Sequence, residues 1–161
     1  MSEGGPVILA AGGTGGHLFP AQALAEEFFA RGRPLVLITD RRGDAFTGAL
    51  GEIECFAVRT GTPTGRSLWG RLDGFKEIAL GTLHAGRILR RLKAGAAVGF
   101  GGYPSLPTML AAMRAGLPSV IHEQNAVLGR ANRLLARRAT AIAISMADTK
   151  GLDNRAHRKM R

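Results

Sequence analysis

The chain has 161 residues, of which 45% are apolar and 21% are charged, and its formal net charge is +10. This length and composition suit one globular domain and argue against an intrinsically disordered chain. A single cysteine, Cys55, excludes a disulfide within the chain, which fits a reducing compartment. Two long uncharged stretches, residues 4–25 and 94–113, are interrupted by glycines, so the sequence predicts no transmembrane helix.

The charge is unevenly distributed along the chain. The first 60 residues carry five Lys or Arg against seven Asp or Glu, whereas the remaining residues carry 17 against five. A positive field of this kind attracts polyanions, which include nucleic acids, anionic lipids and phosphorylated substrates. Charge alone does not choose among these partners.

Six short apolar runs predict buried strands, and the segments between them predict helices. The runs are continuously apolar rather than alternating, which is typical of a parallel sheet buried on both faces. Strands that alternate with helices predict an α/β fold with a doubly wound, Rossmann-like parallel sheet. The predicted strands are Pro6–Ala10, Pro34–Ile38, Glu52–Val58, Ala96–Phe100, Pro118–His122 and Thr140–Ile144. The predicted helices are Pro20–Ala30, Leu68–Leu92 (which could break at Gly74 or Gly81), Leu106–Ala115 and Leu128–Arg138.

Ligands of such sheets bind beyond the carboxyl ends of the strands, and the first strand is followed by the glycine-rich sequence AAGGTGGH at residues 10–17. Glycines let a phosphate approach the backbone closely, and the N–H groups at a helix N-terminus favour an anion. A dinucleotide-binding fingerprint needs its last glycine at position 18, which is Leu18, although Asp40 stands where such a motif has the acid that binds ribose. A P-loop needs a lysine, and this loop has none. A glycine turn without a ligand is the alternative.

Two further strand-to-helix corners carry polar residues. The second corner, GFGGYPS at residues 99–105, adds the hydroxyl group of Tyr103. The third, HEQN at residues 122–125, places four polar side chains directly after an apolar strand. A packed aromatic ring and a solvated loop are the alternatives for these two corners. His122 and Glu123 lack the spacing of metal ligands, so the sequence predicts no metal site.

Three motifs, AGGTGGHLFPA, GFGGYPS and HEQNAVLGRANR, occur in this order and together resemble the MurG family of peptidoglycan glycosyltransferases. The resemblance covers residues 6–146. It implies one half of a GT-B glycosyltransferase, in which two Rossmann-like domains face a cleft. It also implies an inverting hexosyltransferase that moves N-acetylglucosamine from UDP-N-acetylglucosamine to undecaprenyl-pyrophosphoryl-MurNAc-pentapeptide (lipid I to lipid II), without a cofactor.

Carried onto this sequence, the resemblance predicts an acceptor-binding domain over residues 1–146. Residues 147–161 would be a basic linker to a donor domain that this chain lacks, so we expect the chain by itself to be inactive. His17 is the expected general base on the acceptor hydroxyl, because an imidazole with a pKa near 6.5 can take a proton at neutral pH. Glu123 is the rival base, in which case His17 only contacts the pyrophosphate. The resemblance implies substrate contacts for Gly12, Gly13, Thr14, Gly15, Gly16, Gly102, Tyr103, His122, Asn125 and Asn132.

A basic amphipathic segment forms a second, independent feature. Residues 66–93 hold seven Lys or Arg against two acidic residues, beside the only tryptophan. Such a segment is typical of an element that lies on a membrane surface. Because the lipid tail of the acceptor stays in the bilayer, we expect a peripheral protein at the cytoplasmic face of the bacterial inner membrane. The residues expected to contact the membrane are Leu68, Trp69, Leu72 and Phe75, and those expected to pack on the sheet are Ile78, Leu83, Ile88 and Leu92.

Other classes of function remain as alternatives. The incomplete glycine fingerprint argues against a nucleotide-binding oxidoreductase-type domain. A nucleic-acid-binding module would show interleaved aromatic residues or a known motif, which this sequence lacks, so nucleic acid is not an expected partner. A non-catalytic lipid- or acceptor-binding module is the third alternative. The expected partners are UDP-N-acetylglucosamine, mainly through the absent domain, the lipid I acceptor and an anionic membrane surface.

Overall fold

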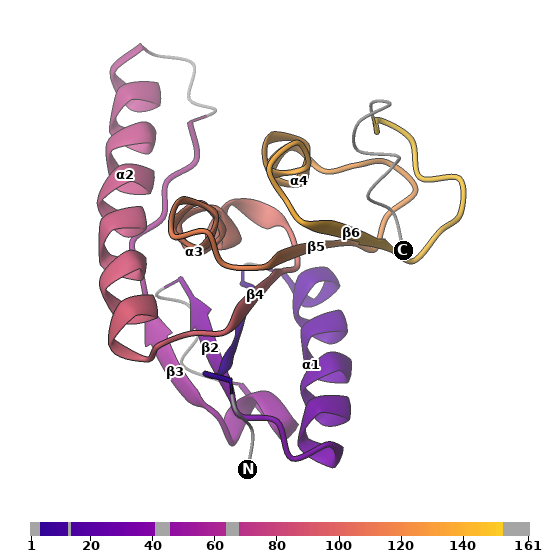
Figure 1. Cartoon of the computed structure of the whole chain (residues 1–161). Coiled ribbons are helices and arrows are strands. Elements are labelled where there is room, and N and C mark those ends of the chain that lie inside the picture. The colour runs from indigo at the N-terminus through magenta and orange to yellow at the C-terminus, as the bar shows by residue number, and fades with distance from the viewer. Residues whose placement is uncertain (1–3, 13, 41–45, 64–67, 153–161) are drawn as a thin grey trace.

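The computed structural model describes residues 4–12, 14–40, 46–63 and 68–152, which form one parallel sheet with helices on both faces (Figure 1). The strand order is β3-β2-β1-β4-β5-β6, so the direction of winding reverses between β1 and β4. The strands are β1 Val7–Ala10, β2 Leu35–Thr39, β3 Glu54–Ala57, β4 Ala96–Gly99, β5 Ser119–Glu123 and β6 Ala141–Ile144. The helices are α1 Gly15–Ala30, α2 Leu68–Arg91, α3 Gly102–Arg114, α4 Arg130–Leu135 and the short 3-10 helix η1 Gly48–Gly51. The predicted α/β class with a doubly wound parallel sheet is confirmed.

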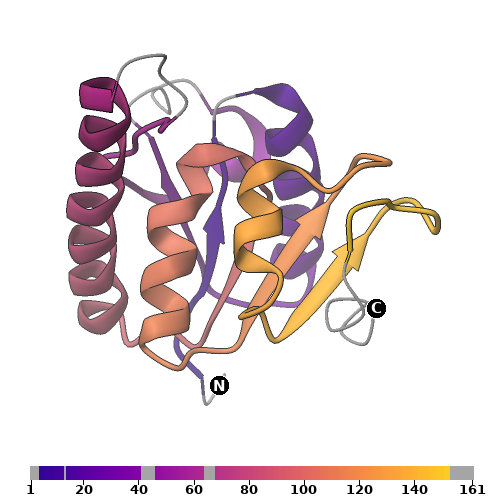
Figure 2. The same cartoon turned by 90° about the horizontal axis from the view of Figure 1, so that it is seen from above.

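The central strand β1 shows how the sheet separates two apolar cores. Ile8 and Leu9 are both fully buried and point to opposite faces, as successive residues of a strand must. Ile8 belongs to the core that α2, α3 and α4 cover, and Leu9 belongs to the smaller core under α1 and η1. Figure 2 shows α2, α3 and α4 side by side over one face of the sheet.

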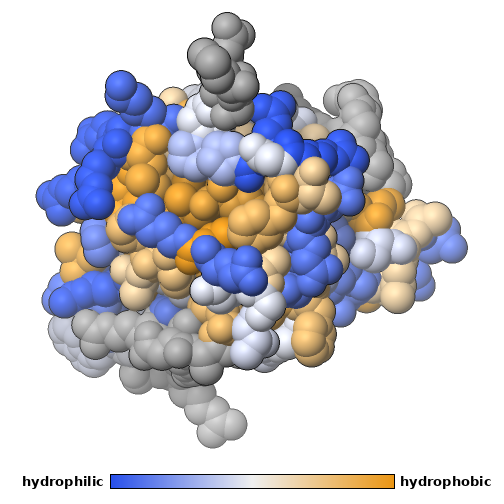
Figure 3. Space-filling model, turned by 90° about the horizontal axis from the view of Figure 1, so that it is seen from below, coloured by the Kyte–Doolittle hydropathy of each residue, from blue (hydrophilic) through white to orange (hydrophobic). Residues whose placement is uncertain are grey.

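The second face is covered only in part, which corrects the prediction of a sheet buried on both faces. α1 lies over the middle of this face, and beyond it Val120 of β5 and Ala143 of β6 are only half-buried. They line an apolar hollow of about 780 Å³, which we call the sheet-face groove. Figure 3 shows this side of the molecule, where apolar side chains gather in a hollowed band edged by hydrophilic ones. The groove is lined by Phe19, Pro20, Ala23, Leu24, Glu27, Phe28, Val98, Phe100, Val120, His122, Ala143 and Ser145.

Helices α1 and α3 begin four or five residues earlier than predicted, at Gly15 and Gly102 instead of Pro20 and Leu106. Glycine is a poor residue for a helix interior, but its backbone freedom serves the turn from a strand into a helix. Gly101 and Gly102 have φ values of 86° and 72°, a region that side chains with a Cβ rarely adopt. The glycines are therefore part of the helix starts and not loops before them.

Helix α2 runs from Leu68 to Arg91 without a break. Gly74 and Gly81, the possible break points in the sequence, are buried because the chain after β3 packs directly on them. A Cβ at Gly81 would meet the backbone oxygen of Arg59. Ile78 and Ile88 are buried and Leu92 packs against the core, as predicted. The prediction for Leu83 is wrong, since this side chain is 61% exposed.

Thr149 and Leu152, which lie beyond the predicted boundary at residue 146, pack on the domain. Lys150 accepts a backbone hydrogen bond from Leu128 at 2.8 Å and donates one to Ala126 at 2.8 Å. Thr149 is buried and its hydroxyl donates to the Met146 carbonyl oxygen. Residues 153–161 lie outside the described residues, so the linker stays a prediction. No helix in the described part of the chain has the length and apolar character needed to cross a membrane.

Candidate functional site

A polar cleft of about 290 Å³ opens at the carboxyl ends of β1, β2 and β4. The reversal of strand order between β1 and β4 puts the loops after these strands on opposite faces of the sheet, and this leaves a crevice between them. We call this hollow the strand-end cleft. It is lined by Gly12, Thr14, His17, Asp40, Thr60, Thr62, Gly102, Tyr103 and Pro104.

Two helices, α1 and α3, begin at this cleft. Their first N–H groups have no partner within the helix, and the helix dipole adds partial positive charge there. Gly12 is buried against Thr39 and Pro104, with no room for a Cβ: one would lie 2.9 Å from atoms of both residues. The tight glycine loops thus bring backbone N–H groups close to the cavity, which suits a phosphate or pyrophosphate group.

His17 lies in the first turn of α1 and forms one wall of the cleft. Its Nδ1 lies 2.8 Å from the carbonyl oxygen of Phe100, at the end of β4. The ring packs beneath the glycine pair that starts α3, because a Cβ added at Gly102 would lie 3.2 Å from Nε2. The hydrogen bonds of His17 to described residues all involve Nδ1, so none of these residues competes with a ligand in the cleft for Nε2.

Glu123 ends β5 and is only 1% exposed. One carboxylate oxygen accepts from the backbone N–H and the side-chain amide of Asn125, at 3.1 and 2.9 Å. The other accepts from the backbone N–H of Gly129 and from Asn132, both at 2.9 Å. Burial by itself would raise the pKa of Glu123, but these hydrogen bonds to the charged form outweigh it and lower the pKa.

The hydrogen bonds of Glu123 therefore indicate a structural role, in which its carboxylate holds the loop between β5 and α4 in place. A carboxylate with a lowered pKa whose oxygens are already occupied is a weak proton acceptor, which argues against its predicted role as a base. Asn132 has a similar position: it is 1% exposed and donates to the His122 carbonyl oxygen and to Glu123. Asn125 is exposed at the tip of the loop and outside the cleft lining.

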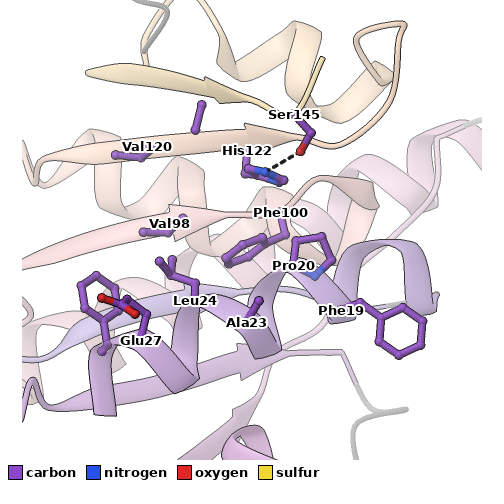
Figure 4. A pocket seen from close by; sticks show the side chains of 12 residues that line it. Phe19, Pro20, Ala23, Leu24, Glu27, Val98, Phe100, Val120, His122 and Ser145 are labelled. Carbon is purple, nitrogen blue, oxygen red and sulfur yellow. Dashed lines mark hydrogen bonds between the residues drawn. The ribbon is translucent and has the colours of Figure 1, made fainter. Parts of the chain in front are cut away.

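His122 points to the other face of β5 and lines the sheet-face groove instead of the strand-end cleft (Figure 4). Its ring packs 5.7 Å from the ring of Phe100, between ring centres, and its Nε2 lies 3.2 Å from the hydroxyl of Ser145. Burial lowers the pKa of His122, although a contact with Gln124 and the charge of Glu123 partly oppose this. The imidazole is therefore neutral at physiological pH.

The structure gathers some of the predicted site residues and separates others. Gly12, Thr14, His17, Gly102 and Tyr103 meet in the strand-end cleft. Gly15 and Gly16 form the first turn of α1 next to it, whereas Gly13 lies outside the described residues. Among the described residues, no group of three His, Cys, Asp or Glu side chains could hold a metal ion.

Sequence reasoning missed Thr60 and Thr62, and it noted Asp40 only for its likeness to a ribose-binding acid. Asp40 is 8% exposed and lines the cleft from the end of β2. Thr60 donates through its hydroxyl to the Tyr103 carbonyl oxygen at 2.9 Å, which ties the chain after β3 to the start of α3. The position of these residues directly after strands was the available signal, because parallel strands end at one edge of the sheet.

Residues 7–144 match the sequence profile of the family described as glycosyltransferase family 28 N-terminal domain. The chain is 56% identical over 141 residues to the UDP-N-acetylglucosamine--N-acetylmuramyl-(pentapeptide) pyrophosphoryl-undecaprenol N-acetylglucosamine transferase of Rhodospirillum rubrum, and 53% identical over 149 residues to that of Rhodospirillum centenum. These matches cover 88% and 92% of the chain. Among solved structures, MurG of Acinetobacter baumannii superposes with a TM-score of 0.75 at 31% identity, over 92% of the chain.

The chain is much shorter than these similar proteins. Its matches span 36% and 39% of the two curated relatives and 44% of the solved MurG chain. The similarity therefore concerns one part of each of those proteins.

Proposed function

This chain belongs to the glycosyltransferase family 28 N-terminal domain family, and on that premise we propose that it is the acceptor-binding half of an N-acetylglucosaminyltransferase of peptidoglycan synthesis. The acceptor would be undecaprenyl-pyrophosphoryl-MurNAc-pentapeptide, and the donor UDP-N-acetylglucosamine would be held mainly by a second domain. The names of the relatives at 53–56% identity support both substrates.

The strand-end cleft suits the pyrophosphate of this acceptor. The N-termini of α1 and α3 both meet there, and each helix begins with a glycine, Gly15 and Gly102. Backbone N–H groups and helix dipoles stabilise a diphosphate without a metal ion. The hydroxyls of Thr62 and Tyr103 are candidates for contacts with the sugar, since these residues line the same cleft and hydroxyl groups can both donate and accept hydrogen bonds. The Thr60 hydroxyl donates to the Tyr103 carbonyl oxygen and can offer the sugar only an acceptor.

The transfer needs a base on the attacking hydroxyl of the acceptor. In the proposed step, Nε2 of His17 takes the proton of that hydroxyl while its oxygen bonds to C1 of N-acetylglucosamine. The bond between C1 and the UDP oxygen breaks, UDP leaves with the electron pair, and the configuration at C1 inverts. His17 is favoured over Glu123 as the base because its Nε2 borders the cleft. Glu123 is buried, and both of its carboxylate oxygens accept hydrogen bonds from the segment that follows β5.

The observation that carries this proposal is the cleft in which two helix N-termini and His17 converge. Titration calorimetry should detect binding of a soluble acceptor analogue that carries MurNAc-pyrophosphate, and binding should weaken in Gly102→Ala. NAD serves as the comparison ligand, because an oxidoreductase-type domain would bind it. Transfer of labelled N-acetylglucosamine should need the donor-binding half as well. Binding of NAD without binding of the acceptor analogue would overturn the proposal.

We further propose that the first turns of α2 contact an anionic membrane at the cytoplasmic face of the inner membrane. Leu68 and Trp69 are 75% and 82% exposed, and Leu72 and Phe75 are more than half exposed. Exposed basic residues of the same helix, Arg71 among them, flank these side chains. Each basic residue near an anionic surface adds about 1 kcal/mol of attraction. Each apolar side chain that enters the membrane interface adds a favourable free energy, because its apolar surface is removed from water.

Co-sedimentation with vesicles tests this membrane contact. Binding should favour anionic over neutral lipid and weaken with salt, because exposed charges are screened. The double variant Trp69→Ala/Phe75→Ala should bind less. The matched control is Phe29→Ala/Leu134→Ala, which removes two exposed apolar side chains from α1 and α4. Equal losses in both variants would contradict a membrane surface on α2.

A further inference from the structure

Two polar groups meet at Nδ1 of His17. The carbonyl oxygen of Phe100 lies 2.8 Å from it, and the side-chain amide nitrogen of Gln124 lies 2.7 Å from it. A carbonyl oxygen can only accept, so a contact of this length requires a proton on Nδ1. A protonated Nδ1 has no lone pair to offer to an amide N–H. The Gln124 nitrogen and the His17 nitrogen would then be two donors facing each other.

Half a turn of the Gln124 amide removes this conflict, because its oxygen and nitrogen ends have nearly the same shape. The amide oxygen then accepts from Nδ1 of His17 together with the Phe100 carbonyl. Before the turn, that oxygen is buried with no hydrogen-bond partner among the described residues, and the same is true of Nδ1 of His122, which lies in contact with Gln124. After the turn, the amide nitrogen donates to Nδ1 of His122, and Nε2–H of His122 donates to Ser145.

We propose that Gln124 is a positioning residue that holds His17 with its proton on Nδ1 and with a bare Nε2 beside Gly102 in the strand-end cleft. The opposite arrangement, in which Gln124 donates to a bare Nδ1, leaves the Phe100 oxygen facing a lone pair at 2.8 Å. It also puts the proton on Nε2, where the nitrogen cannot take a proton from a hydroxyl. The tautomer is a property of this chain, and only its importance for transfer rests on the proposed function.

Among the described residues, the elements around His17 bring few titratable groups toward it. Asp40 reaches the cleft from the end of β2 and Tyr103 from the start of α3. His122 of β5 acts only through Gln124, and Glu123 is held by the loop on the other side of β5. Among the described residues, Asp40 and Tyr103 are therefore the titratable neighbours against which the influence of Gln124 on His17 is measured.

The test is the ¹⁵N NMR spectrum of the imidazole rings in this chain at about pH 8, where the rings are mostly neutral because the ordinary pKa is about 6.5. The signal pattern distinguishes a protonated from a bare ring nitrogen, and His17→Ala identifies the His17 signals. We expect the proton on Nδ1 of His17. A proton on Nε2 would overturn the proposal, and the measurement needs neither donor nor acceptor.

Two variants test the contribution of Gln124 itself. Gln124→Glu keeps an acceptor for Nδ1–H and adds a negative charge, so the pKa of His17 should rise by about one unit or more. Gln124→Leu removes the acceptor, so that pKa should fall, and this variant also keeps the test valid if the glutamate variant does not fold. The signals of the exposed His84 are the control and should not move. An unchanged pKa of His17 in the folded variants would overturn the positioning role.

In a protein that carries both domains, the acid limb of the pH profile of kcat/KM should follow the pKa of His17 upward in Gln124→Glu. The KM for UDP-N-acetylglucosamine should stay the same. A loss that is equal at every pH would indicate a merely structural role and would contradict the proposal. If the tautomer is as expected but His17→Ala transfers sugar normally, the proposed function fails while the positioning by Gln124 stands.

Discussion

The strand-end cleft and the sheet-face groove are both formed by the same sheet, but the groups that line them differ in chemistry. The cleft is the smaller, at about 290 Å³ against about 780 Å³ for the groove. It receives the free N–H groups of two helices, whereas the groove lies over strands whose backbone groups are paired within the sheet. Ends of strands and helices supply unpaired polar backbone, and the face of a sheet supplies mainly carbon. Location, and not size, therefore marks the candidate active site.

The largest expected effect separates the two hollows by activity. In a protein with both domains, His17→Ala should lower kcat by about 10²- to 10⁴-fold, the range for loss of a general base. His122→Phe in the groove should change kcat little, because its ring does not border the cleft. Steady-state transfer assays measure both. A rise in KM for the acceptor alone would instead make His17 a binding residue.

A second effect concerns the loop between the hollows. Glu123→Gln replaces one carboxylate oxygen by an amide NH₂ that faces donors, so two hydrogen bonds are lost inside the protein. We expect the free energy of unfolding to fall by about 2–4 kcal/mol, measured by urea denaturation at neutral pH. Since the pKa of Glu123 is lowered in the folded state, the wild type should lose this advantage only in acid, as pH falls below the ordinary glutamate pKa of about 4.3 and through the folded one. Glu26→Gln on the exposed face of α1 is the control and should cost little.

A third effect distinguishes backbone strain from a change in the cleft. Gly102 and Gly116 both have a φ of 72°, but only Gly102 lies against the His17 ring, while a Cβ at Gly116 would meet nothing within 4 Å. Each change to alanine should cost about 1–2 kcal/mol of stability for the left-handed backbone. Only Gly102→Ala should also lower kcat/KM, because its Cβ presses on Nε2. Equal activities of the two variants would contradict the placement of the ligand beside Gly102.

The smallest expected effect belongs to the groove. Because the pKa of His122 is lowered in the folded state, the unfolded chain binds a proton at a higher pH than the folded chain does. Stability should therefore decrease as pH falls below about 6.5, until the folded pKa is reached, with a slope of at most about 1.4 kcal/mol per pH unit. Thermal or urea denaturation across this range measures the slope. The slope should be smaller in His122→Phe and unchanged in His84→Phe, and an unaltered slope in His122→Phe would contradict a lowered pKa of this half-buried imidazole.

Much of the fold followed from local patterns. The six apolar runs became six strands, and the buried ones leave a plain signal because such strands need continuous apolar sequence. The prediction of burial is wrong for the edge strand β3, in which three of the four residues are exposed. The helix starts were misplaced, since the propensity of glycine argues against a helix at Gly15 and Gly102 while the geometry of the strand-to-helix turn requires glycine there. Leu83 was assigned to the core because its type and spacing resemble those of Ile78 and Ile88, and only the packing of α2 on α3 shows which side of the helix is buried.

For the candidate site too, some features could be predicted from the sequence and others depended on the tertiary structure. The sequence by itself determined that glycine loops and His17 stand at strand ends, and the residue types there already pointed to a phosphorylated ligand. It assigned His122 and Glu123 to one site and ended the strand at His122, whereas β5 extends through Glu123, so the two side chains point to opposite faces of the sheet. Only the tertiary structure decided that one of them lines an apolar groove and that the other is buried under four hydrogen bonds. The physical reason is that periodicity fixes direction relative to the strand, whereas the neighbours that a side chain meets come from segments far away in the sequence.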